Sequence, residues 1–258
     1  MSLTRLALRF AAPVPKIESF DRFLFIGPHP DDIEIGAGAT AAKLAAAGKE
    51  VFFLVCMDGR YGLDYAPPGT TPEALVERRR VEAEASARLL GAKAVQFLDL
   101  CDGGFYERDE LIRGIARVIG ALKPDVIFAP DPDVDSECHV DHRNVGEAAR
   151  RLAFFAPFAP IMARYGSEAA PVRALAYYMT AKPNRYVKTT GWLDKQLSSI
   201  FDCHQTQFPA DSGAAKSVRL YLRLRAVDFG VRSGLGLAEG FRVLGQTQMH
   251  CLPEAGSR

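Results

Sequence analysis

Gly27-Pro28-His29-Pro30-Asp31-Asp32-Ile33-Glu34-Ile35-Gly36 joins a short apolar run to a segment of small residues. The apolar run, residues 23–26, is typical of a buried parallel strand. The segment from 36 to 48 predicts a helix that ends at a glycine. A histidine and two aspartates therefore stand at the carboxyl end of the first expected strand, where open α/β sheets bind ligands. Ionisable groups packed this closely beside a buried strand would repel or desolvate one another, so a divalent cation is the simplest partner for them.

Strand-like and helix-like segments alternate along the first 155 residues. We expect strands at 23–26, 51–56, 95–98 and 125–129, and helices at 36–48, 73–90, 109–122 and 145–155. Such alternation favours βαβ units with right-handed crossovers in a mostly parallel sheet. We predict a single α/β domain over residues 1–258. Its Rossmann-like core, a doubly wound and mostly parallel sheet, spans about 20–155, and a C-terminal α/β extension spans about 156–258.

The segments outside this core give weaker patterns. Residues 3–10 suggest an edge strand, and the Pro/Ala-rich stretch 156–170 suggests an insertion or a linker. In the extension, strands are expected at 172–180 and 241–244 and helices at 193–204 and 214–231. The loop 63–71 contains two prolines and a glycine, and a loop of this kind near a site can act as a lid.

The composition of the chain limits the molecules that it is expected to bind and the compartment in which it is expected. The 32 basic and 31 acidic residues give a net charge of +1, so no nucleic-acid partner is expected. The five cysteines form no CxxC pair, and an odd number suits a reducing compartment. The apolar start of the chain is short and interrupted by Arg5 and Arg9, and no run approaches the roughly 20 apolar residues of a membrane helix. We expect a cytoplasmic protein without membrane contact.

A second histidine cluster, His139-Val140-Asp141-His142, follows the fourth expected strand. In a doubly wound sheet the exits of the first and fourth strands open on the same edge, so the two clusters can face each other. His29, Asp32 and His142 would then supply two imidazoles and one carboxylate, which is the ligand count of a catalytic zinc site with one open position. If the helix of 145–155 begins earlier, near Asp141, His142 lies in its first turn, where the helix dipole disfavours the protonated ring.

The remaining polar side chains of the two clusters fit metal-assisted hydrolysis of an amide. Asp31 can accept a proton from the attacking water, whose pKa a metal lowers. His139 can stabilise the developing oxyanion or protonate the leaving amine. Asp141 can hold the ring of His139, as a triad carboxylate does, although capping of the helix is an equally good explanation for an aspartate there.

These motifs resemble the LmbE-like (PIG-L) family of zinc-dependent de-N-acetylases, which remove acetyl from N-acetylglucosamine attached to another group. The resemblance implies that His29, Asp32 and His142 bind Zn²⁺, that Asp31 is the general base, and that His139 is the electrostatic partner and acid. It also implies that Arg79 and Asp102 contact an amino-sugar substrate. Further matching segments are Arg79-x-x-Glu82, Leu90-Gly91, the loop with Asp102-Gly103, Cys203-His204-Gln-Thr-Gln and Ala238-Glu239-Gly-Phe241-Arg.

Two features bear on the branch of the family. The diacetylchitobiose deacetylases are oligomers in which a histidine near the C-terminus reaches the site of a neighbouring subunit, and His250 stands where such a substrate-binding residue would lie. The resemblance thus allows a homo-oligomer. At 57–60 this chain has Met-Asp-Gly-Arg, where many relatives have Thr-x-Gly-Glu, so the group attached to the sugar stays open.

Two other functions are compatible with parts of the sequence. Gly36-x-Gly38-x-x-Ala41, with Asp58 downstream, nominally fits the fingerprint of an NAD(P)-binding oxidoreductase. That fingerprint requires its glycines directly after the strand, whereas residues 28–35 intervene here and their carboxylates would repel phosphates. Close packing of helix on sheet is the simpler explanation for the glycines. The other alternative is a metal-binding protein without catalytic activity, in which a fourth protein ligand would complete the site.

Overall fold

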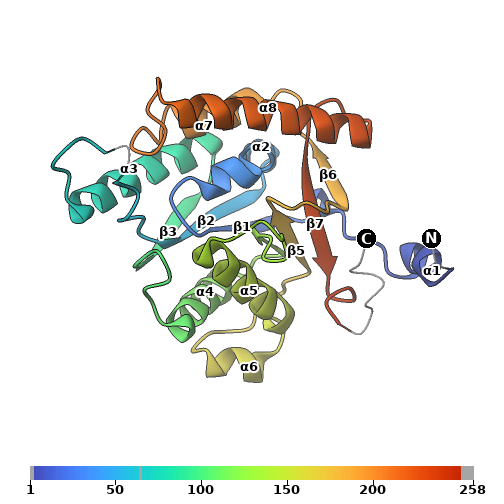
Figure 1. Cartoon of the computed structure of the whole chain (residues 1–258). Coiled ribbons are helices and arrows are strands. Elements are labelled where there is room, and N and C mark those ends of the chain that lie inside the picture. Colours follow the sequence, from blue (N-terminus) through green and yellow to red (C-terminus); the bar gives the residue numbers. More distant parts are fainter. Residues whose placement is uncertain (1–2, 64–65, 251–258) are drawn as a thin grey trace.

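One mixed sheet lies between two layers of helices in the computed structural model, which describes residues 3–63 and 66–250 (Figure 1). Within these residues the sheet has seven strands in the order β3-β2-β1-β4-β5-β7-β6. Strands β1 to β5 pair in parallel, and β7 is antiparallel to both β5 and β6. The strands are β1 (Arg22–Gly27), β2 (Glu50–Met57), β3 (Ala94–Leu100), β4 (Val126–Pro130), β5 (Ala174–Tyr178), β6 (Arg185–Lys188) and β7 (Ala238–Gly245).

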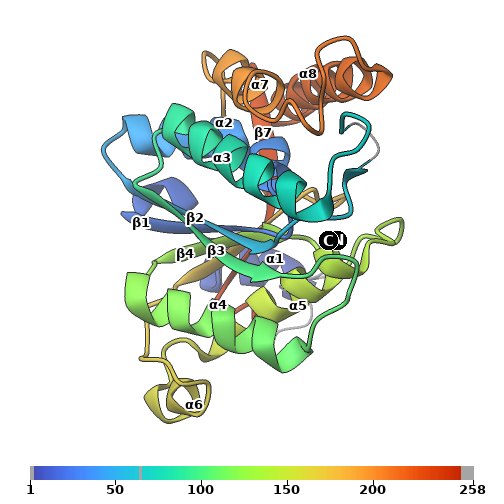
Figure 2. The same ribbon diagram turned by 90° about the vertical axis from the view of Figure 1, so that its left-hand side faces the viewer.

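The helices divide between the two faces of the sheet. Helices α2, α3, α7 and α8 cover one face, and α4, α5 and α6 cover the other (Figures 1 and 2). The helical elements are α1 (Leu3–Ala11), η1 (Ile17–Ser19), α2 (Asp32–Ala46), α3 (Pro72–Leu90), α4 (Arg108–Leu122), α5 (Val140–Phe155), α6 (Ala159–Arg164), α7 (Leu193–Phe201) and α8 (Gly213–Ser233). The predicted α/β architecture, with a doubly wound and mostly parallel sheet, is therefore confirmed.

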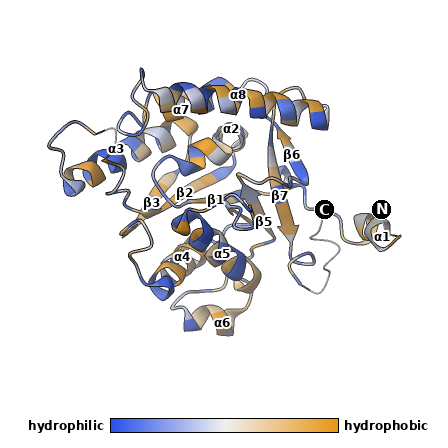
Figure 3. Cartoon of the chain, in the orientation of Figure 1, coloured by the Kyte–Doolittle hydropathy of each residue, from blue (hydrophilic) through white to orange (hydrophobic). Residues whose placement is uncertain are grey.

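Successive side chains of a strand point to opposite faces of the sheet, so each face has its own apolar core. In β1, Phe23 and Phe25 pack with α2 and its neighbours, whereas Leu24 and Ile26 pack with α4 and α5. Both sets are fully buried because a parallel strand covered by helices on two sides has no face toward water. Figure 3 shows the central strands as mostly apolar and the helices as mixed. The long apolar runs of the sequence thus become the inner strands of the sheet.

Glycines bring α2 close to the sheet and to α7. A Cβ added at Gly36 would lie 2.1 Å from the ring of Tyr178, and one at Gly38 would lie 3.0 Å from the Gln196 side chain. Helix α2 also begins at Asp32, four residues before the expected start, so both glycines lie inside the helix and not at its N-terminus. The packing explanation for these glycines is confirmed, and the dinucleotide fingerprint loses its structural basis.

Three segments differ from the sequence expectations. Residues 3–10 belong to α1 and are not an edge strand, since Leu3, Ala7 and Phe10 repeat at helical spacing. The stretch 156–170 contains α6, and β6 was not expected. Cys251 and the rest of 251–258, together with 64–65 of the expected lid, lie outside the described residues. In the described part of the chain, no helix is both long enough and apolar enough to cross a membrane.

Candidate metal centre

The turn after β1 presents His29 and Asp32 on one side. The backbone N–H of His29 donates to Asp32 Oδ2 at 2.8 Å, and His29 Nδ1 lies 3.1 Å from the same oxygen. Both side chains are buried, and Asp32 occupies the first helical position of α2. The i, i+3 spacing predicted from the sequence therefore places both groups at one point of the sheet edge.

The third residue of the cluster, His142, lies on helix α5, which follows β4 in the chain. His142 lies in its first turn, and His142 Nε2 is 3.4 Å from Asp32 Oδ2. Ligand atoms of His29, Asp32 and His142 all lie within 4.8 Å of one another. The structure thus joins two segments that are 110 residues apart in the sequence, as the positions of the two clusters at the strand ends predicted.

The charges of this cluster depend on one another. Burial disfavours the charged form of His29, but hydrogen bonds with Asp141 and Asp32 outweigh it and raise the pKa of His29 to about 10. Burial likewise opposes charging of His142, and Asp32 raises the pKa of that ring to about 9. Burial alone would raise the pKa of Asp32, yet the two histidines hold it well below its usual range. A cation bound here would take the place of the protons on the two rings.

Asp31 is not among the three clustered ligands and pairs with Arg79. Its Oδ2 accepts from Arg79 Nη2 at 3.2 Å, and the same nitrogen donates to the carbonyl of Pro30 at 2.8 Å. Arg79 Nη1 donates to the carbonyl of Gly59 at 3.1 Å. Burial raises the pKa of Asp31 to about 6, although the charge of Arg79 works in the opposite direction. A buried carboxyl with a pKa near neutrality beside a candidate metal site is well placed to take up a proton.

Asp141 contacts His29 more closely than His139. Its Oδ2 is 3.1 Å from His29 Nε2 but 3.8 Å from His139 Nδ1. The carboxylate also accepts from the backbone N–H groups of Gly103 and Gly104 at 2.7 and 2.9 Å. Burial alone would raise the pKa of Asp141, but the hydrogen bonds from His29 and Gly103 lower it. Asp141 therefore supports His29 at hydrogen-bond distance and also lies within ion-pair distance of His139, whose support by this carboxylate stays a prediction.

His139 caps helix α5 and stays accessible. Its Nδ1 accepts from the backbone N–H of Asp141 at 3.3 Å, and its side chain is 47% exposed. The ring centroid lies 4.7 Å from that of His29 and 5.0 Å from that of His142. Partial burial and the charges of these two rings lower the pKa of His139. An accessible imidazole therefore stands over the cluster, where it can meet a substrate.

The three residues expected to bind substrate lie in different surroundings. Arg79 is 4% exposed and is engaged by protein groups. Asp102 accepts from the backbone N–H of Tyr61 at 3.4 Å, its buried Oδ1 has no partner among the described residues, and burial raises its pKa. His250 packs beside Phe154, with 5.4 Å between ring centroids. Phe154 is twelve residues along α5 from His142, about 18 Å away, so His250 is remote from the site of its own chain.

Sequence reasoning did not single out two neighbours of the site. Glu137 lies 3.0 Å from His142 Nδ1, and only its place in an acidic stretch before the second cluster pointed to it. Glu34 is buried and meets His204 Nε2 at 3.2 Å and the Ser86 hydroxyl at 2.5 Å. Burial disfavours the charged form of His204, but Glu34 raises its pKa. His204 is therefore a buried ion-pair partner.

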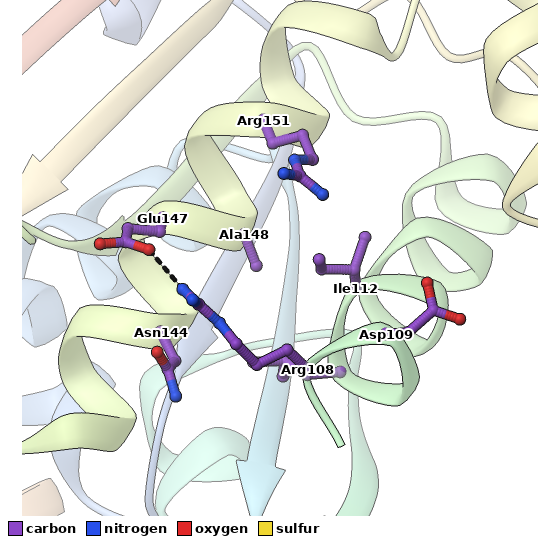
Figure 4. A pocket seen from close by; sticks show the side chains of 8 residues that line it. Arg108, Asp109, Ile112, Asn144, Glu147, Ala148 and Arg151 are labelled. Carbon is purple, nitrogen blue, oxygen red and sulfur yellow. Dashed lines mark hydrogen bonds and ion pairs between the residues drawn. The ribbon is translucent and has the colours of Figure 1, made fainter. Parts of the chain in front are cut away.

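Two grooves lie outside the histidine cluster. One, of about 360 Å³, runs between α4 and α5 and holds the Arg108–Glu147 ion pair at 2.5 Å (Figure 4). None of its lining residues belongs to the expected site. The other, of about 610 Å³, lies between α8 and the segment 134–137, and Glu137 is part of its wall.

Fold and cluster together define a class. A doubly wound sheet that carries a His₂Asp cluster and a separate buried carboxylate at its strand ends is an α/β protein with a candidate catalytic metal centre. The chain belongs to the PIG-L family, because the model of that family, described as GlcNAc-PI de-N-acetylase, matches residues 24–153. The family is metal-dependent, and its matched region contains the whole cluster.

Two curated relatives and one solved structure that resemble this chain are deacetylases by name. The chain is 32% identical to the diacetylchitobiose deacetylase of Thermococcus kodakarensis, over 91% of this chain and 87% of that enzyme. It is 28% identical to a 1D-myo-inositol 2-acetamido-2-deoxy-alpha-D-glucopyranoside deacetylase of Kineococcus radiotolerans, over 69% of this chain and 56% of that enzyme. The solved N,N'-diacetylchitobiose deacetylase of Pyrococcus horikoshii, in complex with its inhibitor MPG, has a TM-score of 0.84 and 29% identity, and the match covers 98% of this chain and 97% of that one.

Proposed function

We propose that this protein is a zinc-dependent N-deacetylase that hydrolyses the acetamide of an N-acetylglucosamine conjugate to acetate and a free amine. The observation that carries this proposal is the convergence of His29, Asp32 and His142 beside the separate, buried carboxylate of Asp31. The names of the relatives support N-acetylated amino sugars as the substrate class.

The donor set fits zinc. Zinc in proteins takes imidazole and carboxylate ligands at about 2.0–2.1 Å in a tetrahedron, whose edges are then about 3.3–3.4 Å long. The distances of 3.1 and 3.4 Å from Asp32 Oδ2 to His29 Nδ1 and His142 Nε2 are close to such edges. Three protein ligands leave one position for water or substrate, which favours a catalytic over a purely structural ion. When bound, zinc supplies Lewis acidity that polarises the amide carbonyl and makes water more acidic.

The residues around these ligands have distinct tasks in the proposal. Asp31 takes the proton of the attacking water, and Arg79 holds the Asp31 carboxylate in place. His139 faces the oxyanion that develops on the amide and gives a proton to the leaving amine. Asp102 accepts a hydrogen bond from the sugar, since one of its buried oxygens has no protein partner among the described residues.

Zinc analysis combined with an acetate-release assay tests the roles separately. We expect purified protein to hold zinc and to release acetate from a panel that includes diacetylchitobiose and an N-acetylglucosaminyl inositol. Asp31→Asn should retain zinc and lose about 10²–10⁴-fold in turnover, which is the usual contribution of a general base. His142→Ala should lose both zinc and activity, because it removes a ligand.

The outcomes separate the proposal from its rivals. Full activity of Asp31→Asn would show that the base is another group. Zinc-loaded wild-type protein that hydrolyses no member of the panel would instead be a metal-binding protein without this activity.

Assembly and location form a second, weaker part of the proposal. His250 is exposed and remote from its own site, so a substrate-binding role for it requires a neighbouring copy of the chain. We propose a homo-oligomer on this basis, and the particle mass from light scattering tests it. The free state of Cys56, Cys101, Cys138 and Cys203 supports a reducing compartment such as the cytoplasm.

A further inference from the structure

Each histidine of the cluster is held between two carboxylates. His142 has Asp32 Oδ2 at 3.4 Å from Nε2 and Glu137 Oε2 at 3.0 Å from Nδ1. His29 has the reverse arrangement, with Asp32 at 3.1 Å from Nδ1 and Asp141 at 3.1 Å from Nε2. Asp32 thus lies between the two rings, and Glu137 and Asp141 support the rings from behind.

Glu137 is itself fixed in position. Its second carboxylate oxygen, Oε1, accepts from the backbone N–H of His139 at 2.8 Å. Its own backbone N–H donates to the carbonyl of Val134 at 2.9 Å, which closes a turn in the loop between β4 and α5. The turn holds the main chain and both carboxylate oxygens are engaged, so these contacts direct the side chain toward His142.

We propose that Glu137 is a positioning residue of the metal centre, which orients His142 and selects the tautomer that binds the ion. This inference rests on the proposed zinc function. A hydrogen bond from Nδ1–H to Glu137 leaves the lone pair of Nε2 facing Asp32, where the ion is expected. Carboxylates behind ligating histidines fix ring orientation and raise ligand basicity, and their loss typically lowers metal affinity about 10–100-fold.

Glu137 offers a cleaner test than Asp141. Asp141 is fully buried and also accepts from Gly103 and Gly104, so its replacement would disturb the loop after β3. The Glu137 side chain is 24% exposed and lines the groove of about 610 Å³ beside α8. A smaller side chain at this position opens onto that groove and leaves no sealed cavity, so the variant is expected to fold.

The experiment measures the zinc dissociation constant by competition with a chromophoric chelator. Glu137→Ala should bind zinc about 10–100-fold more weakly than wild type. Glu137→Gln keeps an oxygen that can accept from Nδ1 but loses the charge, so its affinity should lie between the two. Asp135→Asn is the matched control: it removes one negative charge from an exposed position two residues away, and its affinity should stay within about twofold of wild type because exposed charges contribute little.

A second measurement separates positioning from folding. The thermal midpoint of metal-free Glu137→Ala should lie slightly below that of metal-free wild type, because the variant loses the contacts of Glu137 with the His139 N–H and with His142. The rise in midpoint on adding a fixed zinc concentration should also be smaller for the variant than for wild type. Glu137→Ala with wild-type affinity, or Asp135→Asn with an equal loss, would overturn the inference. Wild-type protein that binds no zinc would overturn the proposed function itself, whereas tight zinc binding without acetate release would overturn only the activity.

Discussion

Asp31 combines an unfavourable backbone with a buried charge. Its φ of 119° lies in the left-handed region, which residues with a Cβ rarely adopt, and its side chain makes no capping hydrogen bond to α2. Arg79 offsets this cost, because one guanidinium nitrogen binds both the Asp31 carboxylate and the carbonyl of Pro30. The strained turn and the proposed base are therefore held by a single side chain from α3.

Removal of Arg79 should destabilise the fold as well as the base. Arg79→Met leaves the Asp31 carboxylate and two backbone carbonyls without their donor in a buried site, so we expect a loss of about 3–5 kcal/mol in the free energy of unfolding. Urea titration followed by circular dichroism measures this loss. The neighbouring Arg78 is exposed, and Arg78→Met should change stability by less than about 0.5 kcal/mol. Equal losses for the two variants would contradict the role given to Arg79.

At the level of single residues, the site residues could be predicted from the sequence, but not all of their contacts could. His29, Asp32 and His142 could be placed together because each follows a strand of one parallel sheet, and strand ends share an edge. The contact between Asp141 and His29 could not be foreseen, since it depends on ring orientation and on the path of the loop through Gly103. Local spacing favoured His139 as the partner of Asp141, and in three dimensions His29 is a second and closer partner of this carboxylate.

Helix α2 is interrupted near its start, and β7 repairs the interruption. Ala37 has φ −153° and ψ 16°, so the backbone leaves the helical region between Gly36 and Gly38. Just after this interruption, the N–H groups of Ala39 and Thr40 donate to the Glu239 carboxylate at 3.2 and 2.7 Å. A buried glutamate from the antiparallel strand therefore caps the second half of α2.

This cap should make stability depend on pH. Burial raises the pKa of Glu239 from 4.5 to about 7, although the hydrogen bonds from Thr40 and Ala39 work in the opposite direction. Between these two values the folded protein holds a proton that the unfolded chain has released, so the contribution of Glu239 to stability is present at low pH and is lost as pH rises through 7. The total loss is about 3 kcal/mol.

Comparison of wild type with Glu239→Gln isolates the contribution of Glu239, because the other titrating groups affect the unfolding free energy of both proteins equally. The difference in unfolding free energy between wild type and Glu239→Gln should shift by about 2–3 kcal/mol against wild type from pH 5 to pH 8. Urea unfolding at both pH values measures the shift. A difference that stays constant, or that moves in favour of wild type, would show that Glu239 is already ionised in the folded protein at pH 5.

Helices and strands could be predicted where the sequence has a clear hydrophobic period or a continuous apolar run. Strands β1, β2 and β4 are buried on both faces, so their apolar runs were visible in the sequence. Strand β3 lies at the sheet edge and is mostly only partly buried, yet its short apolar run was still recognisable. Helices α3 and α4 follow from helical spacing. Strand β6, with the sequence Arg-Tyr-Val-Lys, carries no such signal, because it lies at the sheet edge and is only partly buried. The position of β7 between β5 and β6 depends on long-range pairing that single-sequence patterns do not contain.

At the scale of the whole molecule, buried negative charge is concentrated at the carboxyl ends of the parallel strands. Asp31, Asp32, Asp58, Asp102 and Asp141 are all at least 90% buried at the carboxyl ends of β1, β2 and β3 or at the start of α5. Arg60, Arg79 and the histidines balance only part of this charge through direct pairs. A bound divalent cation would tie together groups carried by separate elements, so metal binding should stabilise the entire fold and not merely the site.

The midpoint of thermal unfolding should therefore rise when the candidate metal centre binds zinc. Free zinc at about 100 times its dissociation constant adds about 2.7 kcal/mol to the folded state, which corresponds to a rise of about 5–10 °C for a domain of this size. Differential scanning fluorimetry of chelator-treated protein, with and without zinc, measures the rise. His142→Ala should abolish it, because the ligand set is broken, whereas Asp31→Asn should preserve it, since the base is proposed to act on water and not on the ion. A rise that survives in His142→Ala would mean that zinc binds elsewhere on the molecule, and the joint role of the two sheet-edge clusters would be wrong.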